Sequence, residues 1–491
     1  MWPNPQKPLL FKVMENNFKL HNSLSGQKEI FTPKITGQVN LYCCGPTVYD
    51  YAHIGNFRSF LMADLLTRSL EYLGYKVTKI QNITDVGHLT NDDLADADGD
   101  DKIAKKAKAE GKTAWDIAEF FTDAFLEDEA VLRILPPQER PKATEYVPQQ
   151  IAMTETLIAK GYAYEANGSV YFRTAKYAEY GKLSGNNLED LQAGARVEVN
   201  DEKEDPLDFA LWKHAEPSHL MQWKSPWGQG FPGWHIECSA MSQELLPHTD
   251  IHTGGEDNAF PHHECEIAQN ECSHGYNIPY WLHAKHLLVD GKKMSKSKGN
   301  FFTIRDLIAK GYKGEEIRYA LLAAHYRTAL NFTESSLQQA KNSIARIQEA
   351  HRLIETVCDA EPEQKTRTSQ LVETAQSKFT AALCDDLNVA EALAAVFDLV
   401  AEGLKAKDEN TLSADEALLI VEFLERDFNQ VFDVLSFDAA ALPAEVEILL
   451  QQRSEARLNK DFAESDRLRD EIKNLGWEVK DEADGQTVKP L

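Results

Sequence analysis

Hydrophobic positions near the N-terminus form two short runs separated by a helical repeat. The runs cover residues 39–44 and 77–80, and Gly74 stands just before the second run. Between them, apolar side chains recur at the spacing of one helix face: Phe57, Phe60, Leu61, Leu65 and Leu70. This order predicts a strand–helix–strand unit in which Gly74 ends the helix.

A second neighbourhood of the same kind is expected at residues 250–290. Its strand candidates are residues 250–252 and 286–289. Residues 137–225 separate the two neighbourhoods and contain a strand-like run at 169–173. We interpret the intervening segment as an insertion into a split α/β core.

Long helical repeats with few Gly or Pro residues begin after about residue 335. Apolar positions mark two helices: Leu337, Ala340, Ile344, Ile347 and Ile354 in one, and Ala390, Leu393, Val396, Phe397 and Val400 in the other. We therefore predict an α/β protein with a split Rossmann-type domain over residues 1–335, including the insertion at about 137–225. An α-helical bundle over 336–440 and a small charged module over 441–491 are expected to follow.

Charge and cysteine content narrow the function classes. The 491 residues contain 78 acidic and 52 basic side chains, a net charge of −26, which argues against non-specific binding to a polyanion. Seven cysteines are too few for a disulfide framework in a chain of this length. With no signal peptide and no run of 18 apolar residues, the expected location is cytoplasmic, with no membrane span.

A candidate anion site stands at the start of the first predicted helix, at His53, Gly55 and Asn56. Free N–H groups and the helix dipole favour a phosphate there, and Gly55 permits close backbone approach. His53 and Asn56 are three residues apart, so both side chains face the first turn. A helix start with an exposed histidine is the alternative explanation.

A second candidate phosphate segment is the run Lys293-Met294-Ser295-Lys296-Ser297, followed by Lys298 and Gly299. Clustered positive charge, hydroxyl groups and a flexible glycine can hold a triphosphate and follow the charge as a phosphate leaves. Most basic runs are merely solvated loops. This pentapeptide, however, is expected by chance on the order of once in 10⁴ chains of this size.

Four scattered residues have the chemistry of a metal site: Cys44, Cys238, His262 and Glu266. Two thiolates, an imidazole and a carboxylate suit tetrahedral Zn²⁺, and His262 and Glu266 share a helix face at i, i+4. Ligands drawn from both core halves indicate a metal in the active cleft rather than a structural zinc. Spacing alone leaves rival ligands open: Cys43, Cys265, Cys272 and His263.

The two phosphate segments resemble the HIGH and KMSKS signatures of class I aminoacyl-tRNA synthetases. Asn56 departs from the HIGH pattern because it replaces the second histidine and cannot carry a charge. The segments around Cys44, Asn82, Asp208, Cys238 and His262 resemble those of the cysteinyl-tRNA synthetase family. This resemblance implies a ligase that activates L-cysteine with ATP and Mg²⁺ and then transfers it to tRNA(Cys). We expect a monomer.

The resemblance also assigns roles to individual residues. His53, Asn56, Lys293 and Lys296 match catalytic positions. ATP is expected to contact these residues and Gly55, Gly254 and Asp257. Thr47 and Trp234 are expected to line the cysteine pocket. One Zn²⁺ is expected on Cys44, Cys238, His262 and Glu266.

Zinc gives a physical reason for the choice of substrate. A hydrophobic pocket distinguishes side chains that differ by one small group by only about 1–3 kcal/mol. A soft metal that takes the substrate as thiolate excludes serine and alanine far better. We therefore expect no editing domain.

The molecule that receives the activated cysteine is what distinguishes this expected ligase from enzymes with related chemistry. The helical segment near Asp386 and the module around Arg453 and Trp477 resemble the family's anticodon-side regions, although Gly485–Lys489 lacks the family's terminal aromatic residue. A cysteine ligase with an amino-sugar acceptor is the alternative, but those relatives lack such a tail. A zinc hydrolase would need a His-Glu-x-x-His helix, and this sequence does not contain that motif. A non-catalytic RNA-binding module would not need the phosphate and metal residues.

Overall fold

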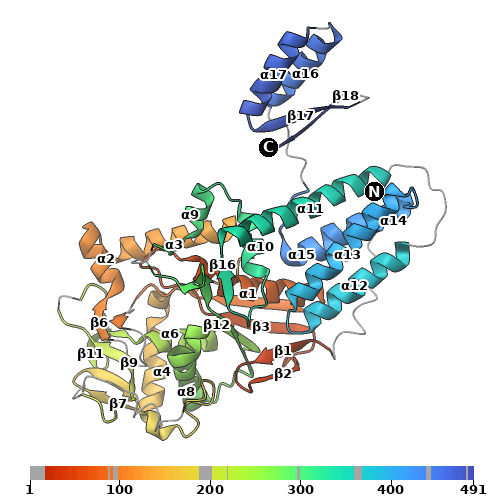
Figure 1. Ribbon diagram of the computed structural model, residues 1–491. Helices are drawn as coiled ribbons and strands as arrows, with labels where there is room; N and C mark the ends of the chain where they lie inside the picture. Colours follow the sequence, from red (N-terminus) through yellow and green to blue (C-terminus); the bar gives the residue numbers. More distant parts are fainter. Residues whose placement is uncertain are drawn as a thin grey trace. The chain divides into compact units, whose positions relative to one another are not determined.

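The N-terminal half of the chain contains a four-stranded parallel sheet (Figure 1). Its order is β13-β12-β3-β4, with bounds Tyr280–Ala284, Ile251–Gly255, Gln38–Cys43 and Lys76–Gln81. Every neighbouring pair is parallel, and Cys43 lies beside Thr253 on one side and Gln81 on the other. The predicted strands at 39–44 and 77–80 are confirmed as a buried parallel pair.

The computed structural model describes residues 17–86, 89–91, 98–186, 202–217, 219–295, 299–358, 368–437, 444–459, 461–482 and 485–490. The chain forms two units, Met1–Leu435 and Ser436–Leu491. Among the described residues, every helix is too short or too polar to cross a lipid bilayer.

Helix α1 (Ile54–Tyr72) connects β3 to β4, as the apolar repeat predicts. Phe57, Phe60, Leu61, Leu65 and Leu70 are all buried. The helix ends before Gly74, whose φ of 91° is readily adopted only by glycine. The predicted stop signal is therefore confirmed.

The second strand–helix–strand unit agrees with the prediction in its first strand, since residues 251 and 252 lie in β12, but differs in its second. It runs from β12 through α8 (Glu264–His274) to β13. Residues 287–289, expected in this sheet, form β14 of a separate sheet with β15 (Lys292–Lys293) and β16 (Leu330–Phe332). The turn at Asp290 and Gly291, both with positive φ, folds β15 back onto β14 and explains the difference.

The segment between the two halves forms a five-stranded antiparallel sheet of order β10-β11-β9-β8-β7. The bounds are Ala163–Ala166 for β7, Ser169–Phe172 for β8, Phe209–His214 for β9, Trp223–Ser225 for β10 and Gly228–Pro232 for β11. Phe172 and Phe209 stack in its core with centroids 4.9 Å apart. The strand expected at 169–173 is thus confirmed.

Shorter elements surround these sheets. They are β1 (Lys19–Asn22), β2 (Gln27–Ile30), β5 (Leu89–Asn91), β6 (Asp98–Asp101), α2 (Lys102–Glu110), α3 (Ala114–Val131), α4 (Val147–Ala159), α6 (Trp234–Leu245), α7 (Glu256–Asn258) and α9 (Ile304–Ala309). A π-helical turn, Ala259–His263, precedes α8. Short 3-10 turns lie at Ala143–Tyr146 and Thr174–Lys176.

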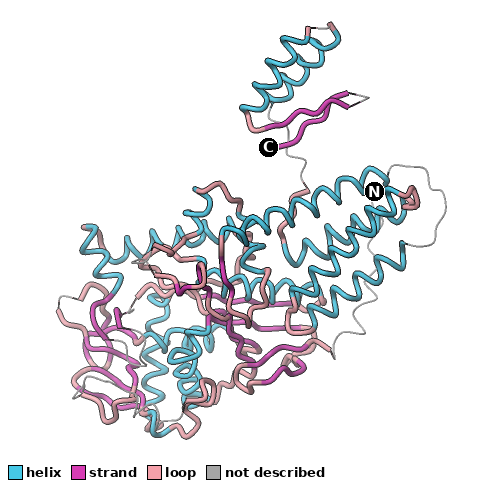
Figure 2. The backbone as a smooth tube through the Cα atoms, in the orientation of Figure 1, coloured by secondary structure: helices cyan, strands magenta, loops and turns pink. Residues whose placement is uncertain are grey.

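Helices dominate residues 314–432 (Figure 2). They are α10 (Gly314–Leu322), α11 (Glu334–Cys358), α12 (Thr368–Cys384), α13 (Val389–Asp408), α14 (Ala414–Glu422), a π-helical turn at Phe423–Phe428, and α15 (Asn429–Phe432). The five apolar positions predicted for the first long helix are all buried in α11. The predicted domain limits at 335 and 440 stay predictions.

The C-terminal unit pairs two helices with a hairpin: α16 (Ala444–Leu458), α17 (Phe462–Asn474), β17 (Trp477–Glu482) and β18 (Gly485–Pro490). Its small core contains Val446, Leu468, Ile472 and Val479. Arg453 is buried and donates two hydrogen bonds to the carboxylate of Asp481, which ties α16 to the hairpin.

A buried charge network fixes α1 against the helical bundle. Asp64 accepts hydrogen bonds from Arg68 at 2.9 Å and from Arg318 at 2.5 Å, and the Asp64 and Arg318 side chains are fully buried. Arg318 also donates to the carbonyl of Phe432. Burial alone would raise the pKa of Asp64, but the two guanidinium groups hold it below its usual value.

We expect Asp64→Asn to lower the free energy of unfolding by roughly 3–5 kcal/mol, because it leaves buried guanidinium charge uncompensated. The lowered pKa stabilises the fold above the ordinary value of 3.8, so the difference from wild type should shrink as the pH falls below it. Urea unfolding at several pH values measures both effects. The exposed Asp123→Asn is the control, and equal stabilities of the two variants at pH 7 would contradict the role of Asp64.

Candidate active site and metal centre

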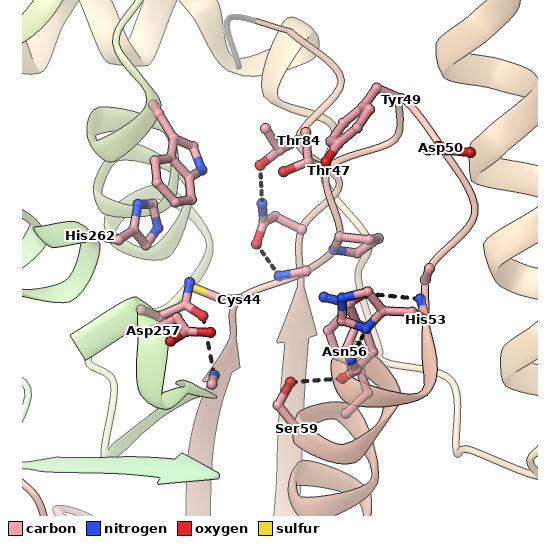
Figure 3. Close-up of a pocket in the computed structure, with 18 of the residues that line it drawn as sticks. Cys44, Thr47, Tyr49, Asp50, His53, Asn56, Ser59, Thr84, Asp257 and His262 are labelled. Carbon is pink, nitrogen blue, oxygen red and sulfur yellow. Dashed lines mark hydrogen bonds between the residues drawn. The ribbon is translucent and has the colours of Figure 1, made fainter. Parts of the chain in front are cut away.

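A cavity of about 370 Å³ opens at the carboxyl ends of β3 and β12, where parallel sheets commonly bind ligands. Residues of the first half, including Thr47, His53 and Asn56, face Asp257 and His262 of the second half across it (Figure 3). The lining consists of Cys44, Gly45, Pro46, Thr47, Tyr49, Asp50, Tyr51, Ala52, His53, Asn56, Ser59, Phe60, Asn82, Thr84, Trp234, Cys238, Gly255, Asp257, Asn258, His262 and Phe301.

The first phosphate segment caps α1. The ring Nδ1 of His53 accepts a hydrogen bond from the backbone N–H of Asn56 at 3.1 Å, and Oδ1 of Asn56 accepts one from the backbone N–H of His53 at 3.0 Å. This capping box fixes both side chains at the positive end of the helix dipole, on the cavity wall. Nδ2 of Asn56 is not part of the box and can donate to an anion.

The second phosphate segment meets the first directly. The backbone N–H of Ile54 donates to the carbonyl of Phe302 at 3.0 Å, and the rings of His53 and Phe301 pack edge to face at 5.1 Å. A Cβ at Gly55 would lie 2.8 Å from Cε of Met294, so glycine lets this side chain lie directly against the helix start. The start of α1 and Phe301, which follows the second segment in the sequence, therefore lie together in the cavity wall.

Asn300 closes the loop that follows β15. Its side chain accepts from the backbone N–H of Ser295 at 2.9 Å and donates to the carbonyl of Lys293 at 3.2 Å. Lys293 is exposed on β15 and is not one of the described residues that line the cavity. Lys296 lies outside the described residues, so its catalytic assignment stays a prediction.

The four predicted metal ligands converge at the floor of the cavity. The ligand atoms of Cys44, Cys238, His262 and Glu266 all lie within 4.8 Å of one another, and all four residues are buried. The two sulfur atoms are 3.9 Å apart, and Nε2 of His262 is 3.0 Å from Oε1 of Glu266. Sulfur, nitrogen and oxygen donors in this number fit a tetrahedral site for a soft or borderline divalent cation.

The electrostatics of the cluster favour a cation. Burial raises the pKa of Cys44 and raises that of Glu266 well above its usual range. A hydrogen bond with Cys44 lowers the pKa of Cys238. Oε2 of Glu266 has no hydrogen-bond partner among the described residues. A bound cation would let these groups stay deprotonated in the interior, which burial otherwise opposes.

Neighbouring side chains orient the ligands. Nδ1 of His262 lies 3.0 Å from Nδ1 of His235, which leaves Nε2 of His262 facing the cluster. Trp234, at the start of α6, stacks on His262 with centroids 4.4 Å apart. Asn82 accepts from the backbone N–H of Gly45 at 2.9 Å and lies 3.6 Å from the sulfur of Cys238.

Three of the four rival ligands belong to neither of the two four-residue groups that could hold a metal ion. The Cys43 thiol contacts the carbonyl of Cys44, Cys265 contacts the hydroxyl of Tyr180, and Cys272 is buried at the far end of α8. His263 belongs to a second possible group, with Cys44, His252 and Glu266. Burial lowers the pKa of both His252 and His263 well below the usual range, which keeps them neutral.

The other residues predicted to contact ATP or cysteine differ in whether they line the cavity. Thr47, Trp234 and Asp257 line the cavity. Gly254, the penultimate residue of β12, packs against His263, where a Cβ would lie 2.7 Å from the ring, and its neighbour Gly255 lines the cavity instead. Gly254 therefore has a packing reason for being glycine.

Several lining residues were given no role by the sequence reasoning, notably Asn82, Thr84 and Phe301. Asn82 and Thr84 directly follow β4 at the carboxyl edge of the sheet, and that position is a signal that could have found them. Thr84 also donates to the buried carboxylate of Glu237 at 2.9 Å.

Comparisons with known proteins agree with this geometry. Residues 30–342 match the tRNA synthetases class I (C) catalytic domain, residues 378–436 the DALR domain, and residues 439–488 the cysteinyl-tRNA ligase anticodon binding domain. The cysteine–tRNA ligase of Salinibacter ruber is 42% identical and covers 95% of this chain and 97% of its own length. That of Thermus thermophilus is also 42% identical, with 95% and 98% covered.

A methionyl-tRNA synthetase structure from Mycobacterium tuberculosis, in complex with methionyl-adenylate, shares the fold at 14% identity and a TM-score of 0.59. It covers 81% of this chain and 90% of its own. The split parallel sheet and the catalytic-domain match define a class I aminoacyl-tRNA synthetase. Within that class the chain belongs to the cysteine–tRNA ligase family. The expectations of an α/β class I fold and of a cysteine–tRNA ligase are confirmed.

We expect Cys44→Ser to lose most of the bound metal, while Cys43→Ser retains it. Alternation along β3 sends adjacent side chains to opposite faces, and only the Cys44 sulfur lies within reach of the other three ligands. Metal analysis of both purified variants after equal dialysis measures the difference. Equal metal content in the two variants would contradict the assignment of Cys44.

Proposed function

We propose that the cavity forms cysteinyl-adenylate from L-cysteine and ATP bound with Mg²⁺, and that the enzyme then transfers cysteine to tRNA(Cys). The observation that carries this proposal is the shared cavity: a phosphate-type helix start lies on one wall, next to Phe301, and a thiol-rich ligand cluster lies on its floor. Such a site can place a thiol-bearing amino acid against the α-phosphate of ATP.

In the first step a carboxylate oxygen of cysteine attacks the α-phosphorus, and the bond to the β-phosphate oxygen breaks to release pyrophosphate. The start of α1, with His53 and Asn56, would bind the phosphates through the helix dipole and hydrogen bonds. Lys293 and Lys296 would balance the negative charge that develops on pyrophosphate. No covalent enzyme intermediate is needed.

The donor set of Cys44, Cys238, His262 and Glu266 supports zinc as the resident metal. Bound zinc would accept the substrate side chain as a thiolate, which favours cysteine over serine. The stack of Trp234 on His262 would form one side of the amino-acid pocket, and Thr47 would contribute a hydroxyl to the cavity wall. Gly255 and Asp257 lie where ribose or the substrate ammonium group would bind.

In the second step a ribose hydroxyl of the terminal adenosine of tRNA attacks the carbonyl of the adenylate, and AMP leaves. Residues of the C-terminal unit have the chemistry to hold RNA. Arg453, Arg457 and Arg469 converge on the single carboxylate of Asp481, which leaves excess positive charge there. Phe462 is 64% exposed and can stack on a base. The sequence pattern gave no role to this aromatic residue. An apolar residue beside a charged helix start is the signal that could have indicated it.

The acceptor distinguishes this proposal from a cysteine ligase for an amino sugar. The matches of residues 378–436 and 439–488 to the DALR and anticodon binding domains favour tRNA. We further propose a monomer in a reducing, cytoplasmic compartment. The sparse cysteine content, seven in 491 residues, supports the compartment.

We expect the protein to catalyse cysteine-dependent ATP–pyrophosphate exchange and to charge tRNA(Cys). Lys296→Ala should lower the exchange rate roughly 10²–10³-fold, the loss expected for one preorganised charge partner of a developing anion. The assay uses purified protein with its metal content measured. The exposed Lys341→Ala, on α11, controls for loss of a lysine charge. Absence of exchange in the wild type would refute the function, and an unchanged rate in Lys296→Ala would refute the lysine role.

We expect Phe462→Ala to raise the KM for tRNA(Cys) about tenfold or more, because stacking on an aromatic side chain contributes about 1–3 kcal/mol per base. Cysteine-dependent exchange, which needs no tRNA, should not change. Ile448→Ala removes another exposed apolar side chain, 55% exposed, from α16 and serves as the control. Equal KM values in the two variants would show that Phe462 does not contact the RNA.

A further inference from the structure

Arg58, one turn after the signature start of α1, is a buried cation whose hydrogen-bond partners among the described residues are all backbone carbonyls. Its side chain is 3% exposed, and its two terminal nitrogens donate to four carbonyl oxygens at 2.5–3.1 Å. The carbonyls belong to Lys285, His286, His325 and Thr328. Burial lowers the pKa of Arg58 to about 10, so the group remains charged at neutral pH.

The four carbonyls lie together where the chain enters the β14–β15–β16 sheet, and we call this place the root of that sheet. Residues 285–286 immediately precede β14, and residues 325–328 lead into β16. Strand β15, which carries Lys293, pairs with β14 through Leu288 and Lys293. Arg58 thus joins α1, which carries His53 and Asn56, to the sheet that carries the second phosphate segment.

The same two residues at the root also contact the opposite wall of the cavity. Oε1 of Glu256 accepts from the backbone N–H of His286 at 2.6 Å, and Oε2 of Glu256 forms an ion pair with Lys285 at 2.7 Å. Glu256 directly precedes Asp257, a lining residue. The root of the sheet is therefore fixed to both halves of the site.

The downstream end of the phosphate loop is attached to α1 as well. Ile54 donates to Phe302, and His53 and Thr303 form a backbone bridge. The described residues on both sides of the phosphate segment, β15 upstream and Phe302–Thr303 downstream, are therefore connected to α1, which begins the other phosphate segment.

We propose that Arg58 is a positioning residue for adenylate formation: by fixing the root of the β14–β15–β16 sheet to α1, it sets the position of β15, which carries Lys293, relative to the His53–Asn56 helix start. This inference rests on the proposed function. Lysine cannot replace arginine here, because one ammonium group cannot reach four carbonyls that a planar guanidinium spans. Loss of the anchor would displace Lys293 from the leaving pyrophosphate without removing it.

The test is single-turnover cysteinyl-adenylate formation by Arg58→Lys and Arg58→Gln. Each should slow the step roughly 10–100-fold, as expected when charged groups are misplaced by about 1 Å. The KM for cysteine and the metal content should stay at wild-type values. Arg173→Lys, which alters another arginine that donates to backbone carbonyls, in the inserted sheet, should leave the rate unchanged.

A double-mutant comparison separates positioning from a general structural effect. In a Lys293→Ala/Lys296→Ala background, Arg58→Lys should slow adenylate formation by less than about threefold, because residues that act as one unit are not additive. A full 10–100-fold loss in that background would overturn the proposal, as would wild-type rates in both Arg58 variants. If neither variant accumulates in folded form by circular dichroism, Arg58 serves the fold alone and the proposal fails. Exchange by the wild type tests the proposed function separately.

Discussion

The burial of two thiols, an imidazole and a carboxylate at one point constrains the whole site. Cys44 arrives from the end of β3, Cys238 from α6, and His262 and Glu266 from the turn and helix that follow β12. Charged forms of these groups are costly in the interior unless a cation compensates them. The sheet order that places β3 beside β12 is what brings the four groups together. The same edge receives the start of α1, so a metal-type cluster and a phosphate-type helix end face one cavity.

Contact between the two signature segments depends on the smallest side chain available. Gly55 leaves room for Met294, and the backbone of Ile54 pairs with Phe302. Arg58 attaches the upstream sheet to the same helix through four carbonyls. Catalysis by positioning and electrostatics requires this kind of rigid support, because no protein nucleophile shares the chemistry. The buried Asp64 network then fixes the helix against the bundle.

Sequence reasoning located the first strand–helix–strand unit well because strong apolar periodicity and Gly74 act locally. It misplaced the second because β13 carries His283 within a short strand, whereas residues 287–289 look like a better strand but turn back at Gly291. Metal ligands could be nominated from residue type and resemblance, yet spacing could not choose Cys44 over Cys43. That choice depends on the pleat of β3. The sequence pattern gave no role to Arg58, Asn82 or Phe462. The partners of Arg58 are backbone carbonyls, which leave no pattern in the sequence. The positions of Asn82 after β4 and of the exposed Phe462 become informative only once the fold is known.

The central claim is that the floor of the cavity recognises cysteine through a metal held by Cys44, Cys238, His262 and Glu266. X-ray absorption at the zinc edge of the purified enzyme, with and without substrate, tests it most directly. The account predicts two sulfur ligands in the free enzyme, a third when cysteine is added, and no change when serine is added. An unchanged sulfur count with saturating cysteine would contradict it.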